Sequence, residues 1–203
     1  MAVENEYKFT SDRTDISACL SELESFLRST GIQYSVQKKQ STDHYYDSEQ
    51  MEITSRGCFI RKRTYSDGKC KLTVKRPISV NGDITREEIE RPSDGTHSEL
   101  QGFCDECFPG VVLNEMPTLT NDCERTVFAF EDKSGAKLYF DKCQFVSGPN
   151  FRDFLEIEYE IVSDKVMADF DDMGLIDFVT RVLGVKPVSE SKYLRGLKWK
   201  NQI

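Results

Sequence analysis

Charged residues stand at every second position along several segments of this 203-residue chain. In the first such segment, Val3 to Phe9, Glu4, Glu6 and Lys8 alternate with mostly apolar residues. Successive side chains of a β-strand point to opposite faces, so the segment predicts a strand with one charged face and one apolar face. Taken alone, this pattern is typical of a sheet surface in contact with water.

The same alternation returns in most of the later strand patterns. Strands are expected over 44–48, 58–63, 69–75, 85–90, 122–130, 137–145 and 154–162, which makes about eight in all. Ser66-Asp67-Gly68 and Asn81-Gly82 are strong hairpin signals, so neighbouring strands are expected to be antiparallel. The charged positions carry both signs and comprise Arg61, Arg63, Lys71, Lys75, Arg86, Glu88, Glu90, Arg125, Asp141, Glu156 and Glu158.

Apolar residues at helical spacing predict helices between residues 14 and 31, 93 and 107, 166 and 183, and 189 and 198. Two architectures fit these elements. The apolar strand faces could form the core of a sandwich, or the sheet could close into an α+β barrel with a charged interior. Helices need apolar sheet surface on which to pack, which favours the eight-stranded antiparallel barrel with its helices outside. No linker or repeat divides residues 1–203, so one domain is expected.

Composition limits the classes of function. Hydrophobic residues make up 38% and charged residues 31%, which fits a folded globular protein. The net charge of −8 argues against nucleic-acid binding. No apolar run approaches the roughly 18 residues of a membrane span, and no signal peptide is recognisable, so no membrane association and a cytoplasmic location are expected.

The seven cysteines are an odd number, and in a reducing compartment they are expected to be free thiols. Cys104 and Cys107 form a CxxC motif, but no second pair follows at the spacing of a zinc site. Any metal is therefore expected to be a hard cation bound by carboxylates.

The chain contains a series of motifs whose sequence and order resemble those of the CYTH superfamily, also called the triphosphate tunnel metalloenzymes. The first is Glu4-Asn5-Glu6-Tyr7-Lys8, which matches the amino-terminal ExExK signature. The resemblance covers almost the whole chain and continues through Asp43-His44-Tyr45-Tyr46-Asp47, Phe59-Ile60-Arg61-Lys62-Arg63, Leu72-Thr73-Val74-Lys75-Arg76-Pro77, Arg86 to Glu90, Asp141, Leu155-Glu156-Ile157-Glu158 and Ser191-Lys192-Tyr193-Leu194.

The resemblance implies a tunnel that binds a triphosphate together with Mg²⁺ or Mn²⁺. The implied phosphate ligands are Lys8, Arg61, Arg63, Lys71, Lys75, Arg86 and Arg125, with Lys192 and Arg195 closing the tunnel over the substrate. The implied metal ligands are Glu4, Glu6, Glu88, Glu90, Asp141, Glu156 and Glu158. Catalytic roles fall to Glu4, Glu6, Lys8 and Glu158. Cys123 departs from the family pattern, because many members carry a basic residue at that position.

The activity expected from this resemblance is metal-dependent hydrolysis of a small triphosphate, inorganic tripolyphosphate first. Two alternatives stay open. One is an enzyme of an organic triphosphate, which hydrolyses thiamine triphosphate or forms cyclic AMP from ATP. The chain has no clear His-Phe signature of the class IV adenylate cyclases. The other alternative is a polyphosphate-binding module without catalytic activity.

Overall fold

The structure is a computed structural model that describes residues 2–3, 6–13, 15–80, 83–131, 136–160 and 174–201. Within these ranges, the side chains of residues 2–3, 6, 78–80 and 83–86 are not described. The candidate Glu4, the side chains of the candidates Glu6 and Arg86, and the first part of the helix expected over 166–183 therefore lie outside the described residues.

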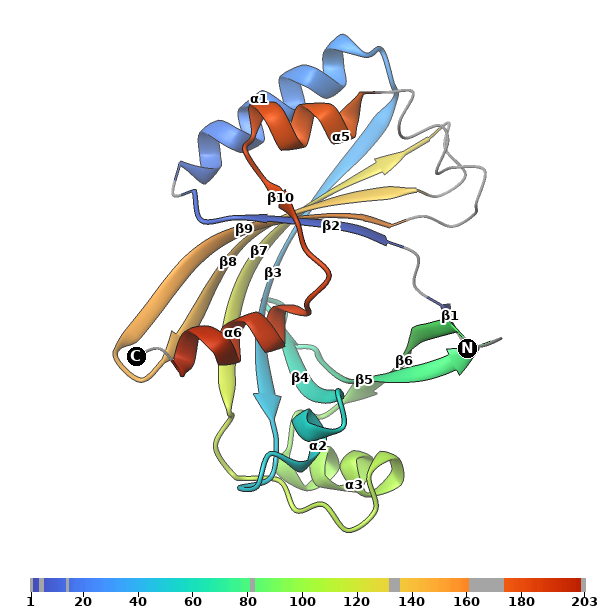
Figure 1. The fold of residues 1–203 in the computed structure, drawn as a ribbon, viewed down its shortest axis with the longest axis vertical. Coiled ribbons are helices and arrows are strands. Elements are labelled where there is room, and N and C mark those ends of the chain that lie inside the picture. The colour runs from blue at the N-terminus through green and yellow to red at the C-terminus, as the bar shows by residue number, and fades with distance from the viewer. Residues whose placement is uncertain are drawn as a thin grey trace.

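The described residues form one sheet of ten strands, and every neighbouring pair is antiparallel, as predicted. The sheet order is β1-β6-β5-β4-β3-β7-β8-β9-β2-β10 (Figure 1). The strands are β1 Ala2–Val3, β2 Glu6–Ser11, β3 Tyr34–Tyr46, β4 Phe59–Tyr65, β5 Cys70–Val80, β6 Asp83–Ser93, β7 Leu119–Phe130, β8 Lys137–Ser147, β9 Asn150–Glu160 and β10 Lys186–Pro187.

The expected closed barrel of eight strands is not what these residues show. Among the described strands, β1 and β10 are the two ends of the sheet, and no pairing joins them. The predicted first strand is divided between two partners, since Ala2–Val3 pairs with β6 and Glu6–Ser11 pairs with β9. The short β10 then pairs with the other edge of β2, and its proline limits further pairing there.

Strand β3 begins ten residues earlier than the sequence predicted. Residues 35–42 are almost entirely polar, so they lack the apolar alternation from which a strand is recognised. The backbone nevertheless pairs with β7 from Tyr34 opposite Phe130 to Tyr45 opposite Leu119. The backbone ladder to β7, rather than burial of its side chains, therefore accounts for this part of β3.

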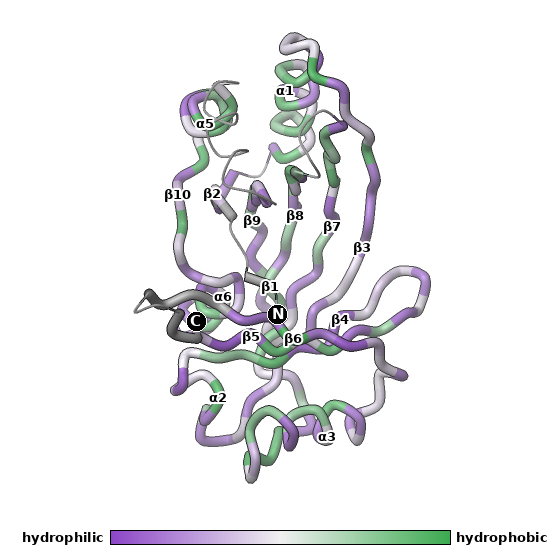
Figure 2. The backbone as a smooth tube through the Cα atoms, turned by 90° about the vertical axis from the view of Figure 1, so that its right-hand side faces the viewer, coloured by the Kyte–Doolittle hydropathy of each residue, from purple (hydrophilic) through white to green (hydrophobic). Residues whose placement is uncertain are grey.

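Helices cover the apolar face of the sheet at two places (Figures 1 and 2). Helix α1, Ile16–Ser29, buries Leu23 and Leu27 against a core that includes Phe128 and Ile157. Helix α5, Leu175–Asp177, continues as a π-helical turn, η1, over Phe178–Val182 and lies beside α1. At the other end of the molecule, α2 Glu52–Ser55 and α3 His97–Cys107 cover a second core built on β4 and β5. The four-residue α2 is too short to be recognised from periodicity.

Helix α6, Lys192–Lys200, lies on the opposite face of the sheet from α1 and α3. Its Tyr193, Leu197 and Trp199 pack against Phe145 and Phe154 of β8 and β9. The helix approaches the sheet closely at Gly196, where an added Cβ would meet a methyl carbon of Leu119 at 2.2 Å. The expectation that all helices pack outside the charged face is therefore wrong for α6. No helix in the described ranges is long and apolar enough to cross a membrane.

Candidate functional site

The face of the sheet that carries Arg61, Arg125 and Asp141, called the charged face below, encloses a cavity of about 240 Å³. Residues of the eight strands β2 to β9 and the start of α6 supply its lining. The lining consists of seven basic and four acidic residues with Tyr45, Phe59, Tyr139 and Ser191; the charged residues are Lys8, Arg61, Arg63, Lys71, Lys75, Arg125, Lys192, Glu88, Glu90, Glu158 and Glu160.

One side of this cavity, the basic wall, is formed by Arg61 and Arg63 of β4 and Lys71 and Lys75 of β5. Lys71 pairs with Glu90 at 2.7 Å and Lys75 with Glu88 at 3.5 Å, and both acceptors lie on the neighbouring β6. Strand alternation accounts for the arrangement, because these side chains stand two or four residues apart and so share one face. Four cations in one wall create a region of positive potential suited to a polyanion.

Asp43 of β3 fixes the two arginines of the basic wall. Its carboxylate is fully buried and accepts hydrogen bonds from Arg63 Nε at 2.6 Å, Arg63 Nη2 at 2.7 Å and Arg61 Nη1 at 3.2 Å. Burial would raise the pKa of Asp43, but the charges of Arg61 and Arg63 outweigh it and hold that pKa far below its ordinary value. The carboxylate is therefore ionised whenever the protein is folded near neutral pH.

The opposite side of the site, the acidic wall, consists of Asp141 on β8 with Glu156 and Glu158 on β9. Asp141 and Glu156 are fully buried, and one carboxylate oxygen from each of the three lies within 4.8 Å of the others. Such a group of oxygens is the ligand set that Mg²⁺ and Mn²⁺ prefer.

Cations from two other elements already contact the acidic wall. Arg125 of β7 donates to Asp141 from Nε at 2.7 Å and from Nη2 at 2.5 Å, and to Glu158 at 2.8 Å. The Lys192 ammonium of α6 lies 2.6 Å from Asp141, 2.7 Å from Glu156 and 3.4 Å from Glu158. Arg195, also on α6, pairs with Glu156.

The charge states of the acidic wall follow from these contacts. Burial opposes ionisation of Glu158, but Lys192 and Arg125 outweigh it and lower the pKa of Glu158 well below its ordinary value. Burial likewise opposes the low pKa that Arg125 and Lys192 give to Asp141. The pKa of Lys192 is raised, since its carboxylate partners outweigh its burial. The three carboxylates of the acidic wall thus enclose the Lys192 ammonium.

The structure brings most of the predicted site residues together. Ten line the cavity: Lys8, Arg61, Arg63, Lys71, Lys75, Glu88, Glu90, Arg125, Glu158 and Lys192. Asp141 and Glu156 lie outside that lining, in contact with Lys192. Arg195 also lies outside it.

Sequence reasoning gave no role to three residues of the charged face. Asp43 stood inside a quoted motif, and only its register opposite Arg63 reveals that it is a counter-ion. Tyr139 lies under the guanidinium of Arg125, 4.3 Å from its carbon to the ring centroid, and donates to Glu160. Both Tyr139 and Glu160 continue ladders with Asp141 and Glu158, which is the signal that could have identified them.

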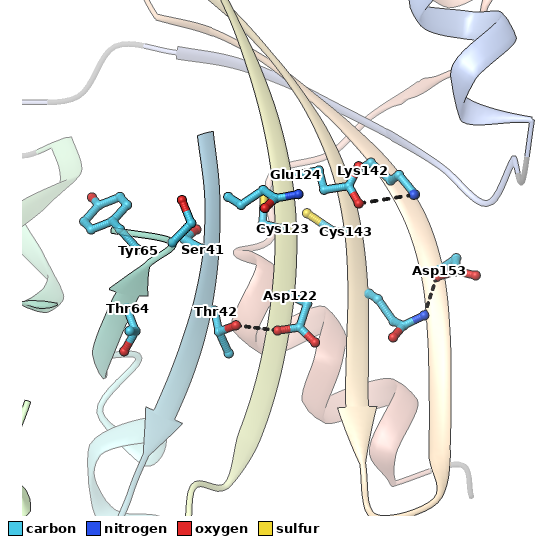
Figure 3. A pocket seen from close by; sticks show the side chains of 13 residues that line it. Ser41, Thr42, Thr64, Tyr65, Asp122, Cys123, Glu124, Lys142, Cys143 and Asp153 are labelled. Atoms are coloured by element: carbon cyan, nitrogen blue, oxygen red, sulfur yellow. Dashed lines mark hydrogen bonds and ion pairs between the residues drawn. The ribbon is translucent and has the colours of Figure 1, made fainter. Parts of the chain in front are cut away.

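A larger cavity of about 420 Å³ lies on the other side of the same strands (Figure 3). Polar side chains there pair across neighbouring strands: Thr42 donates to Asp122 at 2.6 Å, Gln144 to Asp153 at 2.8 Å, and Lys142 pairs with Glu124 at 3.5 Å. These groups satisfy one another, and the charged residues of this lining are three acidic residues and one lysine, so the cavity does not suit a polyanion. The chemistry of the site is therefore assigned to the smaller cavity.

Comparison with solved structures gives matches over nearly the whole chain. The HpAC1 protein of Hippeastrum, a proposed adenylyl cyclase described as having a dominant triphosphatase activity, is 19% identical with a TM-score of 0.63, covering 96% of this chain and 95% of its own. A proposed adenylate cyclase of Bacillus halodurans is 16% identical with a TM-score of 0.59 and coverages of 95% and 96%. The chain has the CYTH fold.

A third protein with this fold comes from Pyrococcus horikoshii and is 21% identical, with a TM-score of 0.54 and coverages of 97% and 99%. No family model and no curated protein matches the sequence. At these identities the likeness establishes the CYTH fold and leaves the activity to be argued from the side chains.

Proposed function

We propose that this protein is a divalent-metal-dependent triphosphatase whose substrate is inorganic tripolyphosphate. The observation that carries the proposal is a cavity with a basic wall fixed by Asp43, next to a group of buried carboxylates of which Glu158 lines the same cavity. Phosphoryl transfer is catalysed mainly by positioning and by neutralising charge, and this cavity offers both. The triphosphatase activity described for the Hippeastrum protein of the same fold supports this choice.

The phosphate oxygens are assigned to the basic wall with Lys8 and Arg125. Arginine forms two parallel hydrogen bonds to phosphate, and the side chains of Arg61 and Arg63 are held in place by Asp43 before any ligand binds. Arg86 remains a candidate from the family pattern alone. Lys192 lines the cavity while it contacts the acidic wall, whereas Arg195 lies outside the lining and would reach a substrate only after leaving Glu156.

The metal, Mg²⁺ or Mn²⁺, is assigned to Asp141, Glu156 and Glu158, whose oxygens are close enough to share one ion. Glu4, Glu6, Glu88 and Glu90 are further candidates from the family pattern. A bound cation would polarise the phosphoryl group and lower the pKa of an attacking water. Lys192 occupies the same carboxylates, so it must be displaced for a cation to enter. Glu158, Glu4, Glu6 and Lys8 are the proposed catalytic side chains.

Chain connectivity supports closure of the sheet into the family's tunnel. Strands β1 and β2 belong to the two ends of the pairing order and are separated in sequence only by Glu4 and Asn5. Three Cα–Cα steps of 3.80 Å separate Val3 from Glu6 by at most about 11 Å. The amino-terminal segment therefore joins β6 to β9, and we assign it as the strand that completes the tunnel.

The aromatic residues of the cavity favour an inorganic substrate over a nucleotide. Tyr45 stacks on Tyr193 at a centroid distance of 4.8 Å, and Arg125 covers Tyr139. Each of these two rings therefore already has another side chain of the protein against one of its faces. An organic triphosphate is the second candidate, because two of the similar structures are proposed cyclases. The seven free cysteines support a cytoplasmic location.

Phosphate release from tripolyphosphate, ATP and thiamine triphosphate, measured with Mg²⁺, Mn²⁺ or EDTA, tests the proposal. We expect tripolyphosphate to be hydrolysed fastest, with no activity in EDTA. We also expect at least a roughly hundredfold loss of kcat in Glu158→Gln, the order of effect seen when one charge-stabilising group is removed. Glu124→Gln, on the other face of the sheet, is the matched control.

Three outcomes would contradict it. Activity that is unchanged by EDTA would remove the metal from the mechanism. Faster turnover of ATP or thiamine triphosphate would assign the protein to the organic triphosphates. Tight binding of tripolyphosphate without turnover in any metal would make it a binding module.

A further inference from the structure

Cys123 and Cys143 form a thiol pair that the sequence does not reveal, because twenty positions separate them. They stand directly opposite each other on β7 and β8 and are both buried. They belong to the cluster that α6 covers on the charged face. Their two sulfur atoms and a carboxylate oxygen of Asp141 all lie within 4.8 Å of one another.

The geometry suits a soft cation. Zinc is bound tetrahedrally, with bonds of about 2.3 Å to sulfur and about 2.0–2.2 Å to a carboxylate oxygen, so the donor atoms of such a site lie roughly 3.5–3.8 Å apart. Three donors within 4.8 Å need to approach one another by about 1.3 Å at most to reach that arrangement. Side chains opposite each other on antiparallel strands are already held at contact distance.

The surrounding charges also suit a soft cation. Two thiolates and one carboxylate carry three negative charges, and a divalent ion leaves one of them uncompensated. Arg125 and Lys192 both contact Asp141, at 2.5 Å and 2.6 Å, and supply positive charge at that point. A buried site with a net negative charge would be costly among apolar side chains alone, and here it is offset.

We propose that Cys123, Cys143 and Asp141 form a binding site for a thiophilic divalent cation such as Zn²⁺ or Cd²⁺. The two thiol protons leave to solvent as the metal–sulfur bonds form. The site is distinct in ligand chemistry from the all-oxygen group of Asp141, Glu156 and Glu158, and sulfur donors select the softer ion. Because Asp141 belongs to both groups, a soft ion at the cysteines withdraws one oxygen from the acidic wall. The site itself does not depend on the proposed hydrolysis.

Titration with Cd²⁺, in a phosphine reductant and without substrate, tests this site. We expect one Cd²⁺ per chain, the ultraviolet charge-transfer band of a cadmium–thiolate bond, and a cadmium NMR shift typical of two sulfur ligands. Cys123→Ala and Cys143→Ala should each weaken binding by more than the 10–100-fold cost of losing an outer-shell partner. The double variant Cys104→Ala/Cys107→Ala, which removes the CxxC of α3, is the matched control and should bind as the wild type does.

Absence of stoichiometric binding to the wild-type protein would overturn the proposal. So would a thiolate band that survives in Cys123→Ala or disappears in the Cys104/Cys107 control. The NMR measurement uses the wild-type protein alone, so it decides the question even where a buried cysteine variant does not fold. A cadmium NMR shift that indicates no sulfur ligand on the bound ion would also reject the site. In the triphosphatase assay, Cys123→Ala should lose inhibition by Zn²⁺ while keeping activity with Mg²⁺.

Discussion

The basic wall and the acidic wall each contain charges of the opposite sign, but those charges come from different kinds of structure. In the basic wall the carboxylate that fixes the two arginines is Asp43, a fully buried residue of the neighbouring strand. In the acidic wall part of the counter-charge comes from Lys192 and Arg195 of α6, a helix that is not part of the sheet. A strand residue paired along a backbone ladder cannot leave without breaking the sheet, whereas a helix can move as a unit.

Because of this difference, the two walls are not equally preorganised for binding a ligand. The arginines of the basic wall are held by Asp43 and line the cavity, so the proposed anion would meet a preformed site. The acidic wall is neutralised from within, and a metal has to compete with the Lys192 ammonium. The cations of the chain thus offset the charge of the buried carboxylates, and the proposed metal would bind in competition with them.

The largest expected effect is on the permanent counter-ion. Asp43→Ala leaves Arg61 and Arg63 buried without their carboxylate, and breaking a buried ion pair typically costs about 3–5 kcal/mol. We expect a fall of that size in the free energy of unfolding measured with urea. Asp122 is an exposed residue on the other face of the sheet, opposite Thr42, the neighbour of Asp43. Asp122→Ala should lower the free energy of unfolding far less. Equal stability of the two variants would show that Asp43 is not a fixed part of the wall.

The next effect is a dependence of stability on acid. Asp43, Asp141 and Glu158 have folded-state pKa values below their ordinary values, so their contribution is present above about pH 4 and is lost as the pH falls further. Each unit of lowering is worth about 1.4 kcal/mol. In Lys192→Met the pKa values of Asp141 and Glu158 should be lowered less. We therefore expect the free energy of unfolding of this variant to fall less steeply as the pH is lowered. An unchanged pH profile would mean that Lys192 is not their partner.

Lys192→Met should also change the affinity of the acidic wall for a metal ion. Lys192→Met removes the internal competitor, so Mn²⁺ should bind the substrate-free protein about tenfold more tightly, which corresponds to about 1.4 kcal/mol. Lys198→Met is the control on the same helix, because Lys198 pairs with Glu190 at the surface. Calorimetric titration measures both. Weaker binding in Lys192→Met would indicate that the ammonium supports the metal site rather than occupying it.

The smallest effect concerns the attachment of α6. The Tyr193 hydroxyl lies 2.9 Å from Thr54 Oγ1, and Thr54 in turn donates to the buried Asp47. Tyr193→Phe removes one hydrogen bond and should lower the free energy of unfolding by about 1 kcal/mol. Leu194→Ala, a more exposed neighbour on the helix, serves as the control. A loss much greater than this would show that the tyrosine, rather than the ion pairs, holds the helix.

The sequence predicted the antiparallel strands and the faces of their charged residues, because alternation is a local property of the chain. It placed Lys75, Glu88 and Glu158 on the face where the structure finds the cavity. It missed the early part of β3, which forms by pairing with β7 rather than by burial. It also could not show that Asp43 and Lys192 act as counter-ions, since both contacts join residues that are distant in sequence.

Separate measurement of anion and metal binding in two variants tests the division between the walls most directly. Glu158→Gln should lose Mn²⁺ affinity while retaining binding of tripolyphosphate without metal. Arg63→Gln should lose tripolyphosphate affinity while retaining binding of Mn²⁺. If either variant weakens both ligands equally, or if Arg63→Gln leaves tripolyphosphate binding unchanged, the assignment of the anion to the basic wall and of the metal to the acidic wall is contradicted.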